Sequence, residues 1–362
     1  MEKLVIMNYQ HLENYYKGKK VFLTGHTGFK GSWLLCWLEF LGAEVMGYAL
    51  PPEKSEDLYH VINGDSICHS ILEDIRDQDK LADAILQFKP DFIFHLAAQP
   101  LVRRSYQQPV DTFEVNVIGT ANILEAVRGL TKPCISVIVT TDKVYENYEK
   151  DYAYKETDRL GGYDPYSASK AASELVVNSY RNSFFNNAEV NTYGKSIASA
   201  RAGNVIGGGD WAEDRIIPDI VRAVSSGSEI RLRNPKAIRP WQHVLDPLMG
   251  YLLLAARMVE NPKKYSEAWN FGPMNEDADL SVKQLAIKAI EIWGQGSIKN
   301  ASSKEHVHEA QLLKLDVIKS LEKLNWKPKL KPEKAIEWTL DFYKNGNSKE
   351  YLLRQILNYQ SL

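Results

Sequence analysis

The sequence predicts an α/β fold in which a parallel β-sheet carries helices on both faces and a smaller lobe follows toward the carboxyl end. Three observations support this prediction. An apolar run, three glycines and an apolar helical stretch follow one another over residues 21–40. Short apolar runs then alternate with helical stretches as far as about residue 206, as in parallel strand–helix–strand units. Beyond that point the alternation breaks down, and this part is expected to form the lobe.

The glycine segment follows a strand expected at Val21–Thr24. Gly25, Gly28 and Gly31 are three residues apart, and an apolar helix begins directly after them. In a dinucleotide-binding corner the first glycine permits a tight turn, the second lets phosphate approach the backbone, and the third lets helix and strand pack closely. The N–H groups and partial positive charge at the helix start also favour phosphate. Three glycines can form an ordinary loop, but their place after the first strand favours a Rossmann-type doubly wound sheet with a bound dinucleotide.

The second strand, expected at Glu44–Leu50, lacks the usual acidic residue at its end. Asp or Glu commonly binds the ribose hydroxyls about twenty residues after the glycines, whereas this strand ends in Tyr48, Ala49 and Leu50. The choice between NAD and NADP is therefore not determined here. A third strand is expected within Ser66–Ile75. Asp74 near its end can accept a hydrogen bond from an adenine amino group or cap the following helix, and the sequence favours neither role.

The next elements bring more polar residues toward the same sheet edge. A helix is expected at Asp79–Phe88, and a fourth strand at Asp91–Ala98 runs into small residues that let a cofactor lie close. A long helix is expected at Pro109–Arg128. Asn116 on this helix is either a core residue bonded to backbone or a brace for the active-site loop. The fifth strand, Ile135–Thr141, is apolar until its last two residues.

The end of the fifth strand and the start of the next helix carry the candidate catalytic residues. Thr141, Asp142 and Lys143 lie where open α/β sheets place their ligands. Tyr166 and Lys170 are four residues apart and share one helix face. A phenol with a pKa of about 10 is a weak base, but a nearby ammonium lowers that pKa. We therefore expect Tyr166 to take a hydroxyl proton while hydride leaves the same carbon for a nicotinamide, with Thr141 orienting the oxygen. The alternative is that Tyr166 and Lys170 are a solvated pair of side chains, four residues apart on the helix, with no catalytic role.

The second half of the chain is expected to complete a cleft. The predicted boundaries are a nucleotide-binding domain at residues 1–200, with a return segment near 238–272, and a substrate-binding lobe at 201–362. Residues 299–308 are expected to form a solvated polar loop. The expected elements are a helix from Tyr166 to about Asn182, a sixth strand at Ser196–Ile206, helices at Ile217–Ser225 and Pro247–Val259, and strands at Glu229–Arg233 and Trp269–Gly272.

Composition narrows the possible functions. Of 362 residues, 44% are apolar and 25% charged, which suits an ordinary globular core. A net charge of -2 gives no reason to expect a nucleic acid or an anionic membrane as partner. The three cysteines are scattered over the chain, at Cys36, Cys68 and Cys134, and their spacing does not match a metal site. So few cysteines, in an odd number, indicate a reducing compartment. The first twenty residues lack the apolar segment of a signal peptide, and we expect a cytoplasmic protein.

Five blocks of sequence resemble the extended short-chain dehydrogenase/reductases, and among them the NAD-dependent sugar-nucleotide 4,6-dehydratases. The resemblance runs from about Lys20 to the end of the chain. It implies a bound NAD, CDP-glucose as substrate, a role in deoxysugar biosynthesis, and a homodimer or homotetramer whose dimer interface uses the helices at 109–128 and 166–182. The blocks are Gly-His-Thr-Gly-Phe-Lys-Gly-Ser-Trp, Gln-Pro-Leu-Val-Arg-Arg-Ser-Tyr, Thr-Asp-Lys-Val-Tyr-Glu-Asn, Arg-Ala-Gly-Asn-Val-Ile-Gly-Gly-Gly-Asp-Trp and Arg-Pro-Trp-Gln-His-Val-Leu.

The resemblance also implies a reaction sequence. NAD oxidises the sugar at C4, water is eliminated across C5 and C6, and hydride returns to C6 to leave a 4-keto-6-deoxy sugar nucleotide. Asp142 would protonate the departing C6 hydroxyl. Most such dehydratases have Glu after this Asp as the base at C5, whereas this chain has Lys143. Lys143 would act as that base only if burial lowered its pKa, or it would bind the cofactor or the enolate charge.

Two sets of binding residues follow from the motifs and the resemblance. Arginine suits a diphosphate because it offers planar, bidentate donors. The expected substrate-binding residues are Gln99, Arg103, Asn204, Arg215 and Arg239. The expected cofactor-binding residues are Gly25, His26, Thr27, Gly28, Phe29, Lys30, Gly31, Asp74, Ile75, Leu96, Ala97, Ala98, Thr140, Tyr166 and Lys170.

Two other functions remain possible on the same fold. A sugar-nucleotide 4-epimerase shares the Thr, Tyr and Lys but has no use for an acid at Asp142. A non-catalytic NAD-binding regulator need not keep Thr141, Tyr166 and Lys170, and the presence of all three argues against it.

Overall fold

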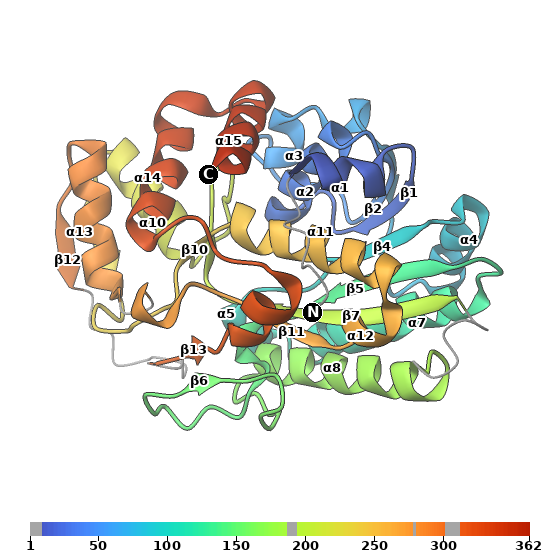
Figure 1. Cartoon of the computed structure of the whole chain (residues 1–362). Coiled ribbons are helices and arrows are strands. Elements are labelled where there is room, and N and C mark those ends of the chain that lie inside the picture. Colours follow the sequence, from blue (N-terminus) through green and yellow to red (C-terminus); the bar gives the residue numbers. More distant parts are fainter. Residues whose placement is uncertain (1–8, 187–193, 278–279, 301–311) are drawn as a thin grey trace.

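The computed structural model of the chain describes residues 9–186, 194–277, 280–300 and 312–362. Its centre is a parallel sheet of seven strands in the order β11-β7-β5-β4-β1-β2-β3 (Figure 1). The order reverses between β1 and β4, which is where doubly wound sheets bind ligands. The predicted fold class is therefore confirmed. The strands of this sheet are β1 (Lys20–Thr24), β2 (Glu44–Ala49), β3 (His69–Leu72), β4 (Phe92–His95), β5 (Cys134–Val139), β7 (Lys195–Ala202) and β11 (Ala268–Phe271).

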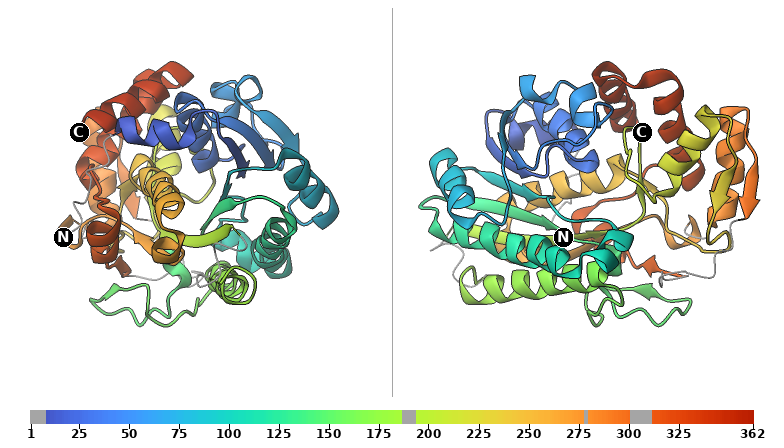
Figure 2. Two further views of the ribbon diagram at one scale, coloured as in Figure 1. Left: turned by 45° about the vertical axis from the view of Figure 1, so that its right-hand side comes forward. Right: turned by 180° about the vertical axis from the view of Figure 1, so that it is seen from behind.

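Both faces of the sheet are covered by helices. Successive residues of a strand point to opposite faces, so each strand contributes side chains to two cores. In β1, Val21 and Leu23 join one apolar core, whereas Phe22 joins the other. The first core lies under α2 (Phe29–Phe40) and α11 (Leu245–Glu260). The second lies over three helices that run side by side in Figures 1 and 2. These helices are α4 (Gln78–Phe88), α7 (Gly119–Gly129) and α8 (Pro165–Ser183).

A third apolar core belongs to the lobe drawn at the left of Figure 1. The last helix, α15 (Lys349–Ser361), instead packs against α2, so the carboxyl end of the chain returns to the sheet. The boundaries of the two domains stay a prediction. The elements of the lobe core are α10 (Ile216–Ser225), β9 (Ile230–Leu232), α13 (Val282–Trp293), β12 (Ile298–Asn300) and α14 (Pro332–Asp341).

Short elements complete the described chain. The short α-helices are α1 (Tyr9–Tyr16), α3 (Leu58–Val61), α5 (Val102–Gln107), α6 (Pro109–Phe113) and α12 (Pro262–Tyr265). The short strands are β6 (Ala153–Tyr154), β8 (Val205–Ile206), β10 (Gln242–His243) and β13 (Lys314–Leu315). Single 3-10 turns lie at Gly64–Ser66, Asp142–Val144 and Asn275–Asp277, and π-turns at Glu114–Ile118, Ser320–Leu324 and Phe342–Gly346.

Three predicted elements differ from the structure. The helix expected at Pro109–Arg128 is interrupted by the π-turn that contains Asn116. The strand expected within Ser66–Ile75 is only β3, because a 3-10 turn occupies its start. The strand expected at Ser196–Ile206 leaves the sheet after Ala202, and Asn204 has a left-handed φ of 47°.

Two further expectations touch the undescribed segments. Residues 301–308 of the predicted polar loop lie outside the described residues, and Lys299 belongs to β12, which pairs with β9. The first eight residues also lie outside them, while the next eight form α1. Among the described helices, none combines the length and the apolar character needed to cross a membrane.

Candidate functional site

The predicted catalytic residues lie together in the structure, at the end of β5 and the start of α8. Thr141, Asp142, Tyr166 and Lys170 are all buried. The Thr141 hydroxyl donates to Asp142 Oδ1 at 2.9 Å, and Thr141 lies close enough to Tyr166 to lower the pKa of its phenol. Lys170 Nζ donates to the carbonyl of Val139 at 3.1 Å, which fastens α8 to the last residue of β5. The arrangement places a phenol, a hydroxyl and a carboxylate beside one another.

The space around Asp142 is shaped by the point where β7 leaves the sheet. A Cβ at Gly203 would lie 1.8 Å from Asp142 Oδ2, so only glycine leaves room for the carboxylate. Asn204 Nδ2 donates to the same oxygen at 3.4 Å. Asn204 was predicted as a substrate ligand, and here it contacts the candidate acid. Gly203 was not assigned to the site, although it lies within the Arg-Ala-Gly-Asn block.

The expected lowering of the Tyr166 pKa by Lys170 is wrong for this structure. Burial raises the pKa of Tyr166 to about 12, against weaker lowering by Thr141 and Arg215. Burial also lowers the pKa of Lys170 to about 8, with Glu174 opposing. Spacing on a helix predicts which residues are neighbours, but the cost of burying a charge depends on the surrounding fold.

The glycine corner has the shape expected for a dinucleotide site. Gly25 has a φ of +73°, and a Cβ there would meet Ala97 N at 2.7 Å. A Cβ at Gly31 would lie 1.9 Å from the carbonyl oxygen of Gly25. Gly28 differs, because the nearest atom would be 3.4 Å away. Protein packing does not exclude a side chain at Gly28, so its absence leaves space for a ligand. No side chain among the described residues caps α2 at Gly28, which suits phosphate binding at this helix start.

His26 and Lys30 have different surroundings within that corner. The His26 ring is fully buried against Gly47, and its Nε2 is 2.8 Å from Ser70 Oγ. Only the backbone of His26 is therefore suited to a ligand. Lys30 Nζ lies 3.5 Å from the hydroxyl of Tyr251 on α11. Burial lowers the pKa of Lys30 to about 7, and Arg215 and Lys170 lower it further. Lys30 thus links the corner to the catalytic residues.

The remaining cofactor candidates line the ends of neighbouring strands. Thr24 Oγ1 accepts from the N–H groups of Leu96 and Ala97 at 3.1 and 3.2 Å, which holds the small residues before Ala98 close to the corner. Thr27 Oγ1 donates to the carbonyl of Leu50 at 2.9 Å. Phe29 is the first residue of α2. The side chains of two other candidates point into protein. Thr140 donates to Glu174 Oε1 at 2.6 Å, and Ile75 packs against Gly119.

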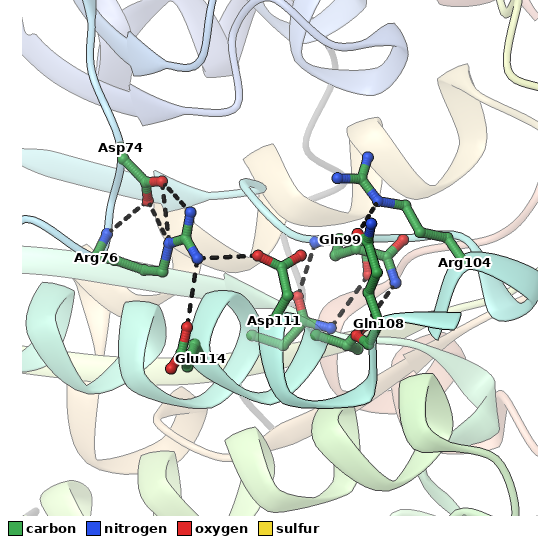
Figure 3. Close-up of polar contacts among 9 residues, drawn as sticks. Asp74, Arg76, Gln99, Arg104, Gln108, Asp111 and Glu114 are labelled. Carbon is green, nitrogen blue, oxygen red and sulfur yellow. Dashed lines mark hydrogen bonds and ion pairs between the residues drawn. The ribbon is translucent and has the colours of Figure 1, made fainter. Parts of the chain in front are cut away.

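Asp74 is engaged by an arginine, as Figure 3 shows. Arg76 Nε and Nη2 bind the Asp74 carboxylate at 3.0 and 2.6 Å, and Arg76 Nη1 reaches Asp111 at 2.9 Å. The hydrogen bonds from Arg76 lower the pKa of Asp74. The helix-cap role considered for Asp74 is wrong, because Asp77 caps α4 by accepting from the N–H of Lys80.

Gln99 and Asn116 brace the loop between β4 and α5. The side-chain oxygen of Gln99 accepts from the N–H of Leu101 at 2.7 Å, and its nitrogen donates to Thr112 at 2.9 Å. Asn116 Oδ1 accepts from the Gln99 N–H at 2.8 Å, and its Nδ2 donates to Ser169 Oγ at 2.8 Å. Both roles considered for Asn116 hold. The polar groups of Gln99 are used within the loop.

Arg103 and Arg215 pair with aspartates of the loop that follows β8, and all three predicted arginines have a protein partner. Arg103 Nη1 is 3.3 Å from Asp214 Oδ1, and Arg215 Nη1 is 2.9 Å from Asp210 Oδ2. Arg239 is mostly buried and donates to the carbonyl of Ile238 at 3.0 Å. The two aspartates and the Lys30 partner Tyr251 were not singled out from the sequence. Asp210 follows the three glycines of the quoted block at residues 201–211, which is the signal that could have identified it.

Lys143 follows Asp142 in a 3-10 turn and is partly exposed. Its backbone N–H donates to Thr141 Oγ1 at 3.4 Å. Within the described part of the chain its ammonium has no hydrogen bond or ion pair. The turn places Lys143 at the edge of the site, and its predicted roles as base, cofactor ligand or cation for the enolate stay predictions.

Comparisons with known proteins agree with this geometry. A family model described as GDP-mannose 4,6 dehydratase matches residues 22–339. A CDP-glucose 4,6-dehydratase of Salmonella typhimurium is 48% identical over 317 residues, which cover 88% of each chain. A dTDP-glucose 4,6-dehydratase of the same organism is 26% identical, over 90% of this chain and 92% of that one.

Solved structures share the fold. A dTDP-glucose 4,6-dehydratase from Streptomyces venezuelae, solved with NAD bound, has a TM-score of 0.74 and 24% identity over 92% of this chain and 99% of that one. A UDP-glucose 4-epimerase from Thermotoga maritima has a TM-score of 0.76 and 23% identity over 90% and 98%. The family resemblance seen in the sequence is confirmed, and the chain belongs to the GDP-mannose 4,6 dehydratase family of the extended short-chain dehydrogenase/reductases.

Proposed function

We propose that this protein is an NAD-dependent sugar-nucleotide 4,6-dehydratase that converts CDP-glucose to CDP-4-keto-6-deoxyglucose and water. The observation that carries the proposal is the buried Asp142 carboxylate, which lies beside Thr141 in the same cluster as Tyr166. A 4,6-dehydratase needs an acid for the C6 hydroxyl next to a base for the C4 hydroxyl, and this cluster contains both. The name of the Salmonella relative supports CDP-glucose as the substrate.

The chain's own residues divide the reaction among them. Thr141 orients the C4 oxygen and Tyr166 removes its proton. Asp142 delivers a proton to the departing C6 oxygen, because hydroxide is a poor leaving group without one. Asn204 and Thr141 hold the Asp142 carboxylate through its two oxygens, so the acid has a fixed position. Lys143 is proposed either as the base at C5 or as a cation for the enolate.

The glycine corner is the proposed NAD site, since Gly28 leaves open space beside the uncapped start of α2. When bound, NAD supplies the hydride acceptor for C4 and the donor for C6, and its cationic nicotinamide ring favours a phenolate nearby. Tyr166 needs such a charge because burial, with the Asp142 carboxylate nearby, raises its pKa to about 12. Calorimetry with both cofactors tests the choice: NAD is expected to bind more tightly than NADP, and the reverse order contradicts it.

The proposed substrate ligands are Arg103, Arg215 and Arg239, with Asn204 at the sugar. Asp214 and Asp210 pair with the first two arginines in the structure. A diphosphate offers oxygens that can replace these carboxylates as bidentate partners. Gln99, also predicted as a ligand, is proposed to act through the loop it braces.

Asp142→Asn tests the proposal directly. Asn keeps the shape of the side chain and a hydrogen bond to Thr141, but it has no proton to give. We expect C4 oxidation to survive and elimination to stall. Mixing the variant with CDP-glucose should build up enzyme-bound NADH, visible by absorbance, with little 4-keto-6-deoxy product. Product formation at the wild-type rate would remove Asp142 from the mechanism and favour the 4-epimerase instead.

The substrate base and sugar are tested separately. The wild-type protein is incubated with CDP-, dTDP-, UDP- and GDP-hexoses, and the 4-keto product is measured. CDP-glucose is expected to give the highest kcat/KM. Lack of product from every nucleotide sugar would contradict a dehydratase and support a non-catalytic NAD-binding protein.

A homodimer or homotetramer is part of the proposal. Val110, Ile118 and Leu175 are exposed by 69%, 51% and 61% on α6, the following π-turn and α8. These apolar side chains suit a four-helix interface between two copies. Leu175→Glu is expected to shift the protein to monomers, measured by light scattering. A cytoplasmic location remains a prediction from the sequence.

A further inference from the structure

Glu174 lies on α8, one helical turn after Lys170 and two after Tyr166, and it is buried. Both of its carboxylate oxygens are bound. Oε1 accepts from Thr140 Oγ1 at 2.6 Å. Oε2 accepts from Ser199 Oγ at 2.7 Å and from Arg201 Nη2 at 2.8 Å. One carboxylate therefore joins the helix of the candidate base to the ends of β5 and β7.

Arg201 extends this connection beyond the catalytic segment. Its Nη1 donates to the hydroxyl of Tyr145 at 2.9 Å and to the carbonyl of Glu156 at 3.1 Å. The guanidinium also lies 5.1 Å from the centre of the Tyr145 ring, and the Tyr145 hydroxyl donates to Asn270 Oδ1 at 2.6 Å. Tyr145 is thereby fixed in position on both sides.

These contacts hold both ends of one short segment. Thr140 precedes Thr141, Asp142 and Lys143, and Tyr145 follows them with one residue between. Thr140 is tied to Glu174 directly, and Tyr145 is tied to it through Arg201. The segment that carries the hydroxyl and the acid is thus anchored to the helix that carries the base.

The cluster is built to stay charged. Burial opposes ionisation of Glu174, but the Arg201 guanidinium and the hydroxyl donors hold its pKa below the ordinary value. The side chains of Arg201 and Glu174 are 4% and 3% exposed, so water cannot replace either partner. A carboxylate held by charge-assisted bonds makes a stiffer anchor than a neutral hydrogen bond.

We propose that Glu174 is a positioning residue for the reaction proposed above, acting through Thr140 and through Arg201 and Tyr145 to keep Thr141 and Asp142 in register with Tyr166. The inference rests on the proposed function, because register matters only if these groups act on one sugar. A displacement of about 1 Å between reacting groups can cost about a hundredfold in rate.

Two hydroxyl deletions at the same carboxylate provide a matched test. Thr140→Val and Ser199→Ala each remove one short hydrogen bond to Glu174, but only Thr140 adjoins the catalytic segment. Both variants are expected to lower the unfolding temperature to a similar extent. Thr140→Val is expected to reduce kcat for CDP-glucose about tenfold to a hundredfold at unchanged KM, while Ser199→Ala stays within about twofold of the wild type. Thr140→Ser, which keeps the hydroxyl, is expected to restore kcat.

Tyr145→Phe examines the other end of the segment, because it keeps the ring over Arg201 and loses only the hydroxyl. It is expected to lower kcat in the same manner as Thr140→Val. Equal kcat values for Thr140→Val and Ser199→Ala overturn the positioning role. NAD affinity is measured by calorimetry, and the role is also overturned if Thr140→Val binds NAD so much more weakly that this accounts for its lower rate. Absence of product from the wild-type protein is a different result, which overturns the proposed function and the inference together.

Discussion

Glu174 and Asp246 are both buried carboxylates, but only Glu174 forms an ion pair among the described residues. Asp246 lies at the start of α11 and accepts from the N–H of Lys329 at 2.7 Å and the hydroxyl of Tyr359 at 2.8 Å. Burial raises the pKa of Asp246 to about 7, against weaker lowering by those hydrogen bonds. The pKa of Glu174 is instead held low by Arg201, despite burial.

The difference shows what each region does. The Glu174 cluster holds a charged carboxylate that is bonded to both ends of the candidate catalytic segment, directly at Thr140 and through Arg201 at Tyr145. The Asp246 site joins α11 to the carboxyl-terminal segments, since Trp326 also donates to its backbone carbonyl at 3.0 Å. Variants that free the catalytic segment from the Glu174 cluster, such as Thr140→Val and Tyr145→Phe, should change turnover, and variants of the Asp246 site should change only stability.

The largest expected effect concerns Tyr166, on the same helix as Glu174. Tyr166→Phe removes the base and should lower turnover of CDP-glucose by about a hundredfold to ten-thousandfold while NAD still binds. Tyr16→Phe is the matched control, because Tyr16 is a buried phenol on α1 whose hydroxyl donates to the backbone carbonyl of Leu252 instead of to a residue of the catalytic cluster. The control should turn over within about twofold of the wild type. Wild-type turnover by Tyr166→Phe would contradict the mechanism.

Breaking the buried pair is the next largest effect. Glu174→Gln leaves the Arg201 charge without its partner, which typically costs about 3–5 kcal/mol of unfolding free energy. Denaturant unfolding measures this loss. A change below about 1 kcal/mol, the range of exposed pairs, would mean that the Arg201 charge finds another partner.

The Asp246 region should respond to pH with a definite sign. The pKa of Asp246 is raised in the folded state. Between about pH 4 and about pH 7 the unfolded chain therefore loses a proton that the folded chain keeps, so the free energy of unfolding falls as the pH rises. Asp246→Asn should remove this slope, worth on the order of a few kcal/mol. Unfolding curves across that range compare the two proteins. An identical slope in both would assign the pH dependence to other groups, and a loss of turnover at neutral pH would contradict the division between the regions.

The smallest effect is expected at Asp74, whose ion pair with Arg76 is partly exposed. Asp74→Asn should change the unfolding free energy by less than about 1 kcal/mol, since solvent screens such pairs. Comparing this loss of unfolding free energy with that of Glu174→Gln shows how much the burial of an ion pair adds to the cost of breaking it. Calorimetry with NAD on the same variant tests the predicted adenine contact, which an unchanged affinity would contradict.

The sequence predicted the fold well because its signals are local. The glycines at 25, 28 and 31 and the apolar strands before and after them depend on near neighbours, and the sheet follows from their alternation. The candidate catalytic set was also predictable, since strand ends of a parallel sheet meet at one edge.

Features that depend on the assembled core were not predictable. The direction of the Tyr166 pKa shift required knowing that burial outweighs neighbouring cations. Residues 196–206 read as one strand, because nothing local in that segment shows that a carboxylate from another strand end needs the space at Gly203. The bonds from the Gln99 side chain to Thr112 and Leu101 could not be predicted for the same reason.

The missing side chain at position 203 ties two positions together. A Cβ there would overlap the carboxyl group of Asp142, whose carbon would be 1.9 Å away. With Asp142 in this position, any side chain at 203 requires the carboxyl group to move. Asparagine at 142 keeps the same volume and the same need for glycine, whereas a residue shorter than aspartate frees the space for a Cβ. Substitutions at positions 142 and 203 are therefore expected to be coupled in their effect on stability.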